Sequence, residues 1–390
     1  RHWHLRDPGV IPNLLQTGAG SPTGICVYEG SLLPKKYQGE VIHSDAGPNV
    51  VRAYPVKKDG AGYEAEIANI ITSEQDKWFR PSDVCIAPDG SLFVADWYDP
   101  GVGGHRIGDQ ERGRIFRIAP AEAKYVFDKL DLSTTEGAIA GIKNPNLARR
   151  YLAWNKLHAL QEQALAQLEE LYQSDNQRNR ARALWLLAGI KGKTGEYVSR
   201  AIQDKNSDIR ITGLRAARRY KQDVIPYVSQ LVKDPSPQVR RECAIALHHN
   251  KSPEAPALWV TLADQYDGKD RWYLEALGIG MDEQEQKFLT AWLKQAGDHW
   301  NTPVGRDLIW RSKIPLAVPY LVKIIEDPKT ELDTLPRYFR ALDFIPGTEK
   351  NRAVAELALI KEPQNKKRET YIIAEAISRM PANTVMQDAK

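Results

Sequence analysis

The feature that most constrains the fold of this chain is a change in the spacing of its apolar residues near residue 120. Before Pro120, short alternating runs are separated by turn-forming residues, which predicts β-strands. The candidate strands are residues 24–30, 39–43, 49–56, 63–71, 82–87, 92–96 and 114–119. From about Asn144 onward, apolar residues recur every three to four positions, which predicts helices. The sequence therefore predicts a mixed multidomain chain, with a β region followed by an all-α region.

The β region contains an internal repeat. Gly24–Val27 aligns with Asp83–Ile86, which places Cys26 in register with Cys85, 59 residues further along the chain. Each unit has the length of four antiparallel strands with one long loop, the size of a β-propeller blade. Two blades cannot close a ring, and open edges would remain at both ends. We therefore predict that residues 1–120 are about two four-stranded C-terminal blades of a partial β-propeller, and that N-terminal blades are missing.

The helical region has a repeat of its own, displaced by 30 residues. Asp204–Arg210 matches Asp234–Arg240, and an apolar helical segment follows each copy. In this motif the aspartate would cap a helix, the Ile or Val would pack inward, and the arginine would pair with an acid of a neighbouring repeat. A helix–turn–helix of this length predicts an α-solenoid over residues 145–390, joined to the β region by a linker at 121–144.

Composition narrows the function classes. The net charge is +4, from 54 basic and 50 acidic residues among 390, so nucleic acid is not the expected partner. No apolar run is long enough for a transmembrane helix. The sequence has no CxxCH motif for covalent haem and no nucleotide-binding, zinc-protease or hydrolase motif.

The loop that begins at the end of the strand 92–96 carries the densest set of reactive side chains. Within eleven residues it holds Asp96, Trp97, Tyr98, Asp99, His105 and Arg106. Asp96 and Asp99 would bind a hard cation, or Asp96 and His105 would act as catalytic residues on a hydroxyl substrate. Trp97, Tyr98 and Arg106 would bind substrate or cofactor. The structural alternative is that Asp96 caps a turn while Trp97 and Tyr98 pack as an apolar plug.

Two smaller groups of polar and aromatic residues lie at strand ends. They are Asp45, Asn49 and Arg52 in the previous blade, and Trp78, Arg80 and Asp83 before an innermost strand. In a substrate site, Arg80 and Asp83 would contact an anion or a sugar hydroxyl, and Trp78 would stack on a sugar ring. Turns and ion pairs that only stabilise the fold are the alternative for both groups. Cys26 and Cys85 either pair in an exported protein or remain buried free thiols.

Four segments carry a resemblance to a bacterial family. They are GSPTGICVYEG at 20–30, DAGPNVVR at 45–52, WFRPSD at 78–83 and PDGSLFVADWYDPGVGGH at 88–105. These segments resemble the bacterial membrane-bound dehydrogenases of the PVC type, whose propeller is similar to that of glucose/sorbosone dehydrogenases. In that family, HEAT repeats follow the propeller and a c-type cytochrome often follows them. Residues 145–380 resemble short bacterial HEAT repeats.

The resemblance implies the C-terminal part of an exported redox protein that is periplasmic, extracellular or membrane-associated. Its complete propeller would act as a quinoprotein-type sugar or polyol dehydrogenase, with pyrroloquinoline quinone and Ca²⁺ as cofactors. Haem c would lie only on a segment that this sequence lacks. The implied partners are the missing N-terminal blades and a cytochrome c module docked on the solenoid. The alternatives are a non-catalytic scaffold that binds protein or ligand, and a nucleic-acid-binding HEAT protein that uses the arginines between residues 210 and 241.

Overall fold

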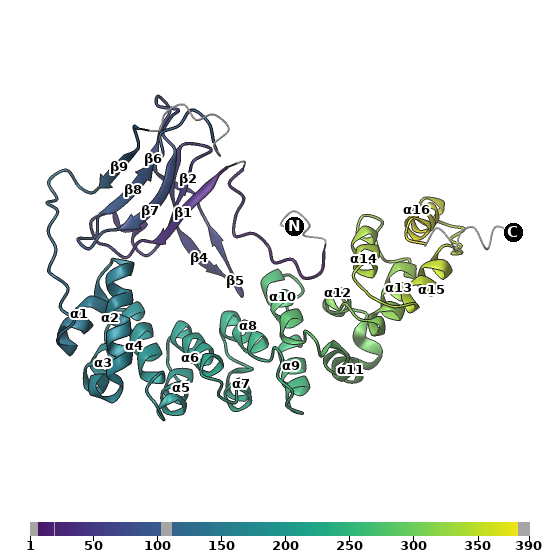
Figure 1. Cartoon of the computed structure of the whole chain (residues 1–390). Coiled ribbons are helices and arrows are strands. Elements are labelled where there is room, and N and C mark those ends of the chain that lie inside the picture. Colours follow the sequence, from purple (N-terminus) through teal and green to yellow (C-terminus); the bar gives the residue numbers. More distant parts are fainter. Residues whose placement is uncertain (1–6, 19, 103–110, 381–390) are drawn as a thin grey trace. The chain divides into compact units, whose positions relative to one another are not determined.

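The computed structural model describes residues 7–18, 20–102 and 111–380. As the sequence predicts, an antiparallel β region of three small sheets is followed by an all-α region (Figure 1). Internal contacts divide the chain into two compact units. The β–α unit is Leu14–Asp59 with Tyr63–Gln222, and the helical unit is Arg1–Asn13, Gly60–Gly62 and Asp223–Lys390. The predicted domain limits at residues 120 and 144 stay predictions.

The three sheets are built from nine strands. The first sheet has the order β1-β2-β3-β6, with β1 (Pro22–Val27), β2 (Val41–Asp45), β3 (Val50–Tyr54) and β6 (Ala68–Thr72). The second is the hairpin of β4 (Val56–Asp59) and β5 (Gly62–Ala65). The third has the order β7-β8-β9, with β7 (Pro81–Ile86), β8 (Leu92–Asp96) and β9 (Arg114–Ile118).

The prediction of two four-stranded units is therefore correct for the first sheet and not for the third, which has three strands among the described residues. Two predicted strands are also divided. Pro55 has no N–H to give to a ladder, so the predicted strand 49–56 ends as β3 and restarts as β4. The predicted strand 63–71 separates into β5, which pairs with β4, and β6, which pairs with β3.

The core of the β region lies between the first and third sheets. Its buried side chains include Ile42, Val51, Ala53, Val84, Leu92 and Val94. Tyr28 is fully buried beside them and donates a hydrogen bond to the carbonyl of Gly90 at 2.7 Å. A Cβ atom at Gly24 would lie 2.1 Å from the carboxylate of Asp83, so the close approach of β1 and β7 requires glycine there.

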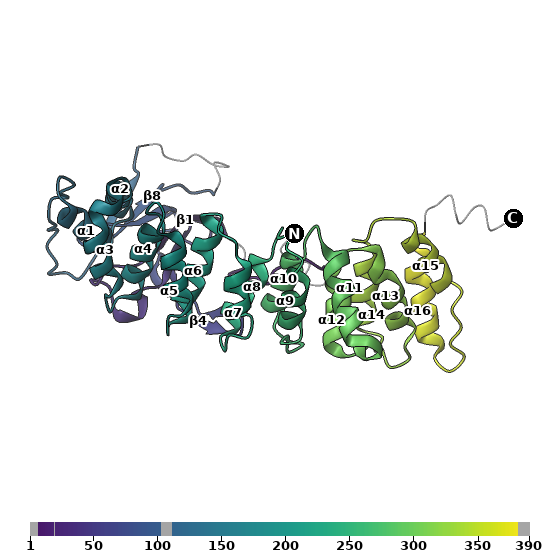
Figure 2. The same ribbon diagram turned by 90° about the horizontal axis from the view of Figure 1, so that it is seen from below.

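Six α-helices among the described residues complete the β–α unit, and together they form a row that runs from α1 to α6 in both views (Figures 1 and 2). They are α1 (Thr135–Lys143), α2 (Leu147–Leu160), α3 (Leu165–Tyr172), α4 (Gln177–Ala188), α5 (Thr194–Ile202) and α6 (Ser207–Arg219). Helix α1 lies within the predicted linker. It forms there because the Thr134 hydroxyl accepts from the N–H of Gly137, and because Ala138 and Ile142 are buried.

The helical unit contains ten helices among its described residues. They are α7 (Ile225–Leu231), α8 (Pro237–Ala246), α9 (Ala255–Ala263), α10 (Arg271–Gly280), α11 (Glu285–Ala296), α12 (Pro303–Arg311), α13 (Val318–Glu326), α14 (Leu335–Leu342), α15 (Glu349–Leu357) and α16 (Lys366–Ile377). Across the described part of the chain, no helix combines the length and the apolar character that a membrane crossing needs.

The 30-residue motif has a different local structure from the predicted one. Ile209 and Val239 are buried, as predicted. However, the cap of α6 is Asn206, which accepts from the N–H of Asp208, whereas the Asp204 carboxylate accepts from the N–H of Asn206. Arginines at positions 150, 210 and 240 each donate to a backbone carbonyl in the turn before their helices, and Arg180 donates to the carbonyl of Tyr172 at the end of the preceding helix. Arg180 also pairs with Asp204 of the following repeat, as the sequence predicted for the arginine of this motif. This spacing extends the repeat to α2, earlier than the sequence match.

Candidate functional site

Asp96 ends β8, and its side chain is 0% exposed. Its Oδ1 accepts from the backbone N–H groups of Arg80 at 2.7 Å and Tyr98 at 2.9 Å. Its Oδ2 accepts from Arg114 on β9, at 2.7 Å from Nε and 2.6 Å from the terminal nitrogen. Arg114 also pairs with Asp76 at 3.0 Å. The carboxylate is thus saturated with donors, which is the arrangement of a group that holds a loop, and its catalytic role stays a prediction.

Arg80 precedes β7 and connects two loops. Its Nε donates to the carbonyl of Asp99 at 3.0 Å, and one terminal nitrogen donates to that of Pro100 at 3.1 Å. The other terminal nitrogen donates to the carbonyls of Ala46 at 2.8 Å and Gly47 at 3.3 Å. These bonds tie the turn after β2 to the loop after β8. Most of the guanidinium donors are therefore engaged by backbone oxygens.

Asp45 and Asn49, from the previous sheet, also bind backbone groups. The Asp45 Oδ1 accepts from the N–H of Ser21 at 2.7 Å and of Gly47 at 3.2 Å. Asn49 has a φ of 59°, in the left-handed region that asparagine tolerates, and its amide donates to the carbonyl of Phe79 at 2.5 Å. Asp45 thus holds its own turn, Asn49 holds the segment before β7, and the role of both residues in binding stays a prediction.

The aromatic residues of the loop differ in their surroundings. The rings of Trp78 and Tyr98 are 5.6 Å apart, and the Arg114 guanidinium lies 4.0 Å above the Tyr98 ring. Trp97 is 55% exposed, so it does not act as an apolar plug within the described residues. Its indole instead lies beside a pocket of about 200 Å³, lined by Ser21, Thr23, Ala46, Arg80, Ser82, Trp97, Gly101 and Val102.

This pocket brings together only two of the predicted binding residues, Arg80 and Trp97. Its volume is below the roughly 300 to 1,000 Å³ of ordinary small-molecule sites. The predicted residues His105 and Arg106 lie outside the described residues. Three hydroxyl side chains, a guanidinium and an exposed indole are the chemical groups that this pocket offers to a ligand.

The predicted cation ligands are Asp96 and Asp99. Asp99 is 2% exposed; one oxygen accepts from the N–H of Gly101 at 2.8 Å, and the other has no hydrogen-bond partner among the described residues. Ca²⁺ takes six to eight oxygen ligands, but Asp96 is already bound to a guanidinium. Among residues 7–18, 20–102 and 111–380, no three His, Cys, Asp or Glu side chains group as metal ligands. The described residues therefore do not fit Ca²⁺ and give no support to a quinone cofactor that depends on it.

The first and third sheets each have an outward face, directed away from their shared core. The register β1-β2-β3 places Ile25, Val27, His43, Arg52 and Tyr54 on the outward face of the first sheet. The register β7-β8-β9 places Asp83, Cys85, Phe93, Ile115 and Arg117 on the outward face of the third sheet. The predicted site residue Arg52 thus lies on the outward face of the first sheet, and Asp83 lies on β7 where Gly24 of β1 approaches it. Hydrogen bonds and a ring contact join Trp78, Arg80, Asp96, Tyr98 and Asp99 around the loop after β8.

On the outward face of the first sheet, four residues form two polar pairs. The Nδ1 of His43 lies 2.9 Å from the hydroxyl of Tyr54, and Arg52 donates through Nε to Asn69 at 3.1 Å. Burial lowers the pKa of His43. His43 and Tyr54 were not predicted as site residues, although the alternation of residues along adjacent strands is a signal that places them beside Arg52.

The three cysteines are free thiols, so Cys26 and Cys85 do not form the disulfide considered from the sequence. Cys26 is partly buried and Cys243 is buried, as expected for free thiols, but Cys85 is exposed. Burial raises the pKa of Cys26 to about 12, with the charges of Cys85 and Asp83 contributing. Burial also raises the pKa values of Cys85 and Cys243.

We expect Cys85 to react with iodoacetamide before the other two thiols in the folded chain, because access and thiolate content both control alkylation. Mass spectrometry of peptides after timed labelling at mildly alkaline pH measures the order. Denatured protein, in which the three rates should converge, is the control. Faster labelling at Cys26 would contradict the exposure described for β1 and β7.

A second cavity was not predicted from the sequence. It has a volume of about 460 Å³ and is lined by Trp154, His158, Arg182, Trp185, Arg219 and Tyr220, from α2, α4 and the end of α6. The rings of Trp154 and His158 stack at 4.8 Å, and the Nδ1 of His158 is buried with no hydrogen-bond partner in the part of the chain that the structure describes. Each helix contributes two residues, so only the packing of successive repeats brings the six together.

Comparisons with known proteins add little to this geometry. A family model described as a domain of unknown function, DUF7133, matches residues 15–122. No curated protein matches the chain. Among solved structures, the crystal structure of an engineered protein is similar at 15% identity, with a TM-score of 0.30, over 62% of this chain and 78% of that one. The dehydrogenase family implied by the sequence resemblance stays a prediction.

Proposed function

We propose that this chain is a non-catalytic binding scaffold of the propeller–HEAT kind that its sequence resembles. In this role the β region binds further antiparallel sheets, and the helical repeats bind partner proteins. The observation that carries the proposal is the exposure of large apolar side chains on both outward faces, where Ile25 is 67% exposed and Ile115 is 74% exposed. Exposed apolar faces are typical of surfaces that bind other proteins or domains.

The equivalence of Cys26 and Cys85 indicates which occupant these faces would take. Cys26 faces the core, where side chains of the third sheet pack around it, whereas Cys85 lies at the equivalent position of the next unit and is exposed. A further sheet packed on the third one would cover Cys85 as the third covers Cys26. In the same way, another sheet would pack on the outward face of the first sheet and cover Ile25, which is the position of the predicted N-terminal blades.

The engagement of the polar loop supports a scaffold over an enzyme. Asp45 binds backbone N–H groups, and Arg80 binds backbone carbonyls although it also lines the small pocket. Asp96 binds two backbone N–H groups and the Arg114 guanidinium. The sugar or polyol dehydrogenase implied by the resemblance is the second proposal, with Trp97 as the surface on which a sugar ring would stack. Its redox groups, its cytochrome partner and its exported location would all come from outside the residues described.

Self-association tests the scaffold proposal, because the outward face of the third sheet in one copy would pack on that of the first sheet in another. We expect the chain to associate with rising concentration in sedimentation velocity. Ile25→Lys and Ile115→Lys should each weaken association about tenfold to a hundredfold, since burying an isoleucine contributes about 1.5–3 kcal/mol. Leu359→Lys, at a residue 79% exposed in the helical unit, is the matched control. A chain that stays monomeric at high concentration, or equal effects of all three substitutions, would refute the proposal.

A further inference from the structure

Residues 7–10 have the sequence Asp-Pro-Gly-Val and form a tight turn. The N–H of Val10 donates to the carbonyl of Asp7 at 3.4 Å, which closes the turn. Gly9, the third residue, has a φ of +92°, and proline precedes it. Proline at the second position and a positive φ at the third are the signature of a type II turn.

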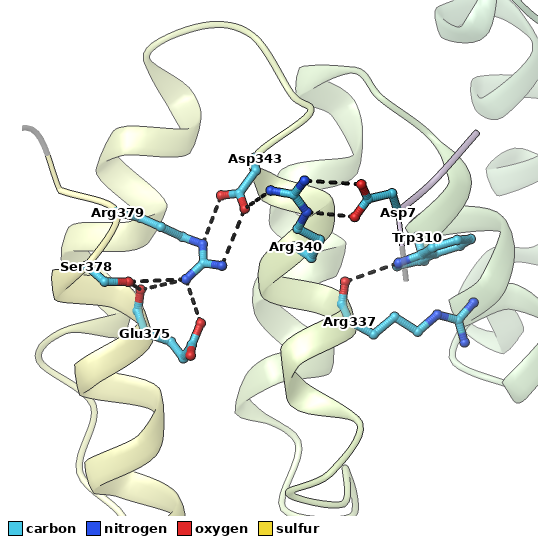
Figure 3. A network of polar contacts seen from close by, with 8 residues as sticks. All are labelled: Asp7, Trp310, Arg337, Arg340, Asp343, Glu375, Ser378 and Arg379. Carbon is cyan, nitrogen blue, oxygen red and sulfur yellow. Dashed lines mark hydrogen bonds and ion pairs between the residues drawn. The ribbon is translucent and has the colours of Figure 1, made fainter. Parts of the chain in front are cut away.

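Side chains of the helical unit bind this turn at several points. Arg340 of α14 forms two parallel bonds with the Asp7 carboxylate, at 2.7 and 3.1 Å (Figure 3). Arg271 of α10 donates to the carbonyls of Asp7 at 3.0 Å and Val10 at 3.1 Å. Glu275 of α10 accepts from the N–H of Gly9 at 3.3 Å. The Asp7 residue is 8% exposed in this position.

The binding side chains are held in place by buried partners. Glu275 is 1% exposed and accepts from Arg271 at 2.8 Å and from Arg311 at 2.5 Å. The guanidinium of Arg271 lies 4.5 Å from the centre of the Trp310 ring, which is fully buried.

Arg340 is supported from its other side. Its free terminal nitrogen donates to Asp343 at 3.1 Å, and Asp343 accepts from Arg379 at 2.9 Å (Figure 3). These contacts set the guanidinium in position before a carboxylate arrives, and preorganisation of this kind increases affinity because less side-chain freedom is lost on binding.

The contacts define what the site recognises. Arg271 and Glu275 bind only backbone atoms of the turn, whereas the two-point contact with Arg340 requires a carboxylate at its first residue. A Cβ atom at Gly9 would lie 2.6 Å from the Lys313 amine, and the positive φ also disfavours other residues. The described contacts therefore favour an Asp-x-Gly turn.

We propose that these residues form a turn groove, made of Arg271, Glu275, Lys313 and Arg340, that binds an Asp-Pro-Gly turn of a partner protein. Residues 7–10 occupy the groove within the chain and act as a tethered competitor. Tethering through a flexible link gives an effective concentration in the millimolar range. A partner turn therefore gains access only when it displaces residues 7–10, which makes their release a control point for binding. This site lies in the helical unit and does not depend on the outward faces of the β region.

Peptide binding to the full chain tests the proposal. The probe is a labelled peptide with the sequence of residues 5–12, titrated by fluorescence anisotropy against the wild type and against Asp7→Ala/Gly9→Ala, which disables the internal turn. We expect saturable binding to the double variant, and binding at least about tenfold weaker to the wild type because its groove is occupied. Addition of Arg340→Ala to the double variant should abolish binding, as should Asp→Asn in the peptide.

The matched control is Arg352→Ala in the double variant. The Arg352 side chain is 85% exposed and forms an ion pair with Glu356, one turn away on α15. It should leave peptide binding unchanged. The proposal would be overturned if the folded double variant showed no binding of the peptide at millimolar concentration. It would also be overturned if the peptide bound equally well after Arg340→Ala. Should the double variant not fold, hydrogen exchange of residues 7–13 is compared between the wild type and Arg340→Ala. Faster exchange in Arg340→Ala supports the groove, and equal exchange overturns it.

Discussion

Replacement of Asp96 by alanine should destabilise the β–α unit by about 3–5 kcal/mol, because each buried donor that loses its acceptor costs roughly 1–3 kcal/mol. The Asp96 side chain is 0% exposed, and its loss would leave the N–H groups of Arg80 and Tyr98 without their acceptor. Arg114, which is 35% exposed, would keep only its ion pair with Asp76. For a unit of this size, the thermal midpoint should fall by roughly 6–20 °C. Differential scanning calorimetry of the full chain measures the change.

Asp76→Ala is the matched control for this result. Asp76 binds the same Arg114, but its side chain is 38% exposed, so its loss should cost at most about 1 kcal/mol. If Asp96 is instead catalytic, Asp96→Ala should abolish oxidation of a sugar or polyol, and the thermal midpoint should stay near that of the wild type. The same variant therefore separates the structural role from the catalytic one predicted by the resemblance.

Replacement of Glu275 by alanine should have an effect of similar size in the helical unit. Glu275 accepts from Arg271 and Arg311, whose side chains are 20% and 9% exposed, and its loss would leave both guanidinium groups partly buried without their carboxylate. We expect a loss of about 3–5 kcal/mol of stability, measured by urea unfolding. The substitution should also weaken the binding of residues 7–10, because the N–H of Gly9 loses its acceptor while the bonds from Arg340 and Arg271 remain.

Glu356→Ala serves as the comparison for Glu275. Glu356 pairs with Arg352 one turn away on α15, and their side chains are 57% and 85% exposed. Such exposed pairs contribute only about 0.3–0.5 kcal/mol. An equal loss of stability in the two variants would show that the burial of Glu275 does not carry the energy assigned to it.

Local patterns were enough to predict the order of the elements. The alternation that marks β1, β7 and β8 and the 30-residue helical motif are properties of short segments, and each appears in the structure near its predicted place. Where a local rule conflicted with the pattern, the rule prevailed, as when Pro55 divided a predicted strand. Helix α1 was not predicted, because a helix of nine residues has too few turns to show a clear repeat of apolar residues.

The candidate site could be predicted only in part, because residue type does not reveal the partner of a side chain. The sequence placed Asp45, Arg80 and Asp96 at strand ends, and in the structure they lie at the end of β2, immediately before β7 and at the end of β8. It did not show that backbone amides and carbonyls would occupy their hydrogen-bonding groups.

The sequence by itself thus determined the two kinds of secondary structure, their order and their internal repeats, since periodicity depends on neighbours a few residues apart. Only the tertiary structure decided which charges meet. Arg340 reaches Asp7 across 333 residues, and Arg114 reaches Asp96 across an antiparallel pair of strands. The energy of a charged or polar group depends on its burial and its partner, and both are set by segments that are distant along the chain.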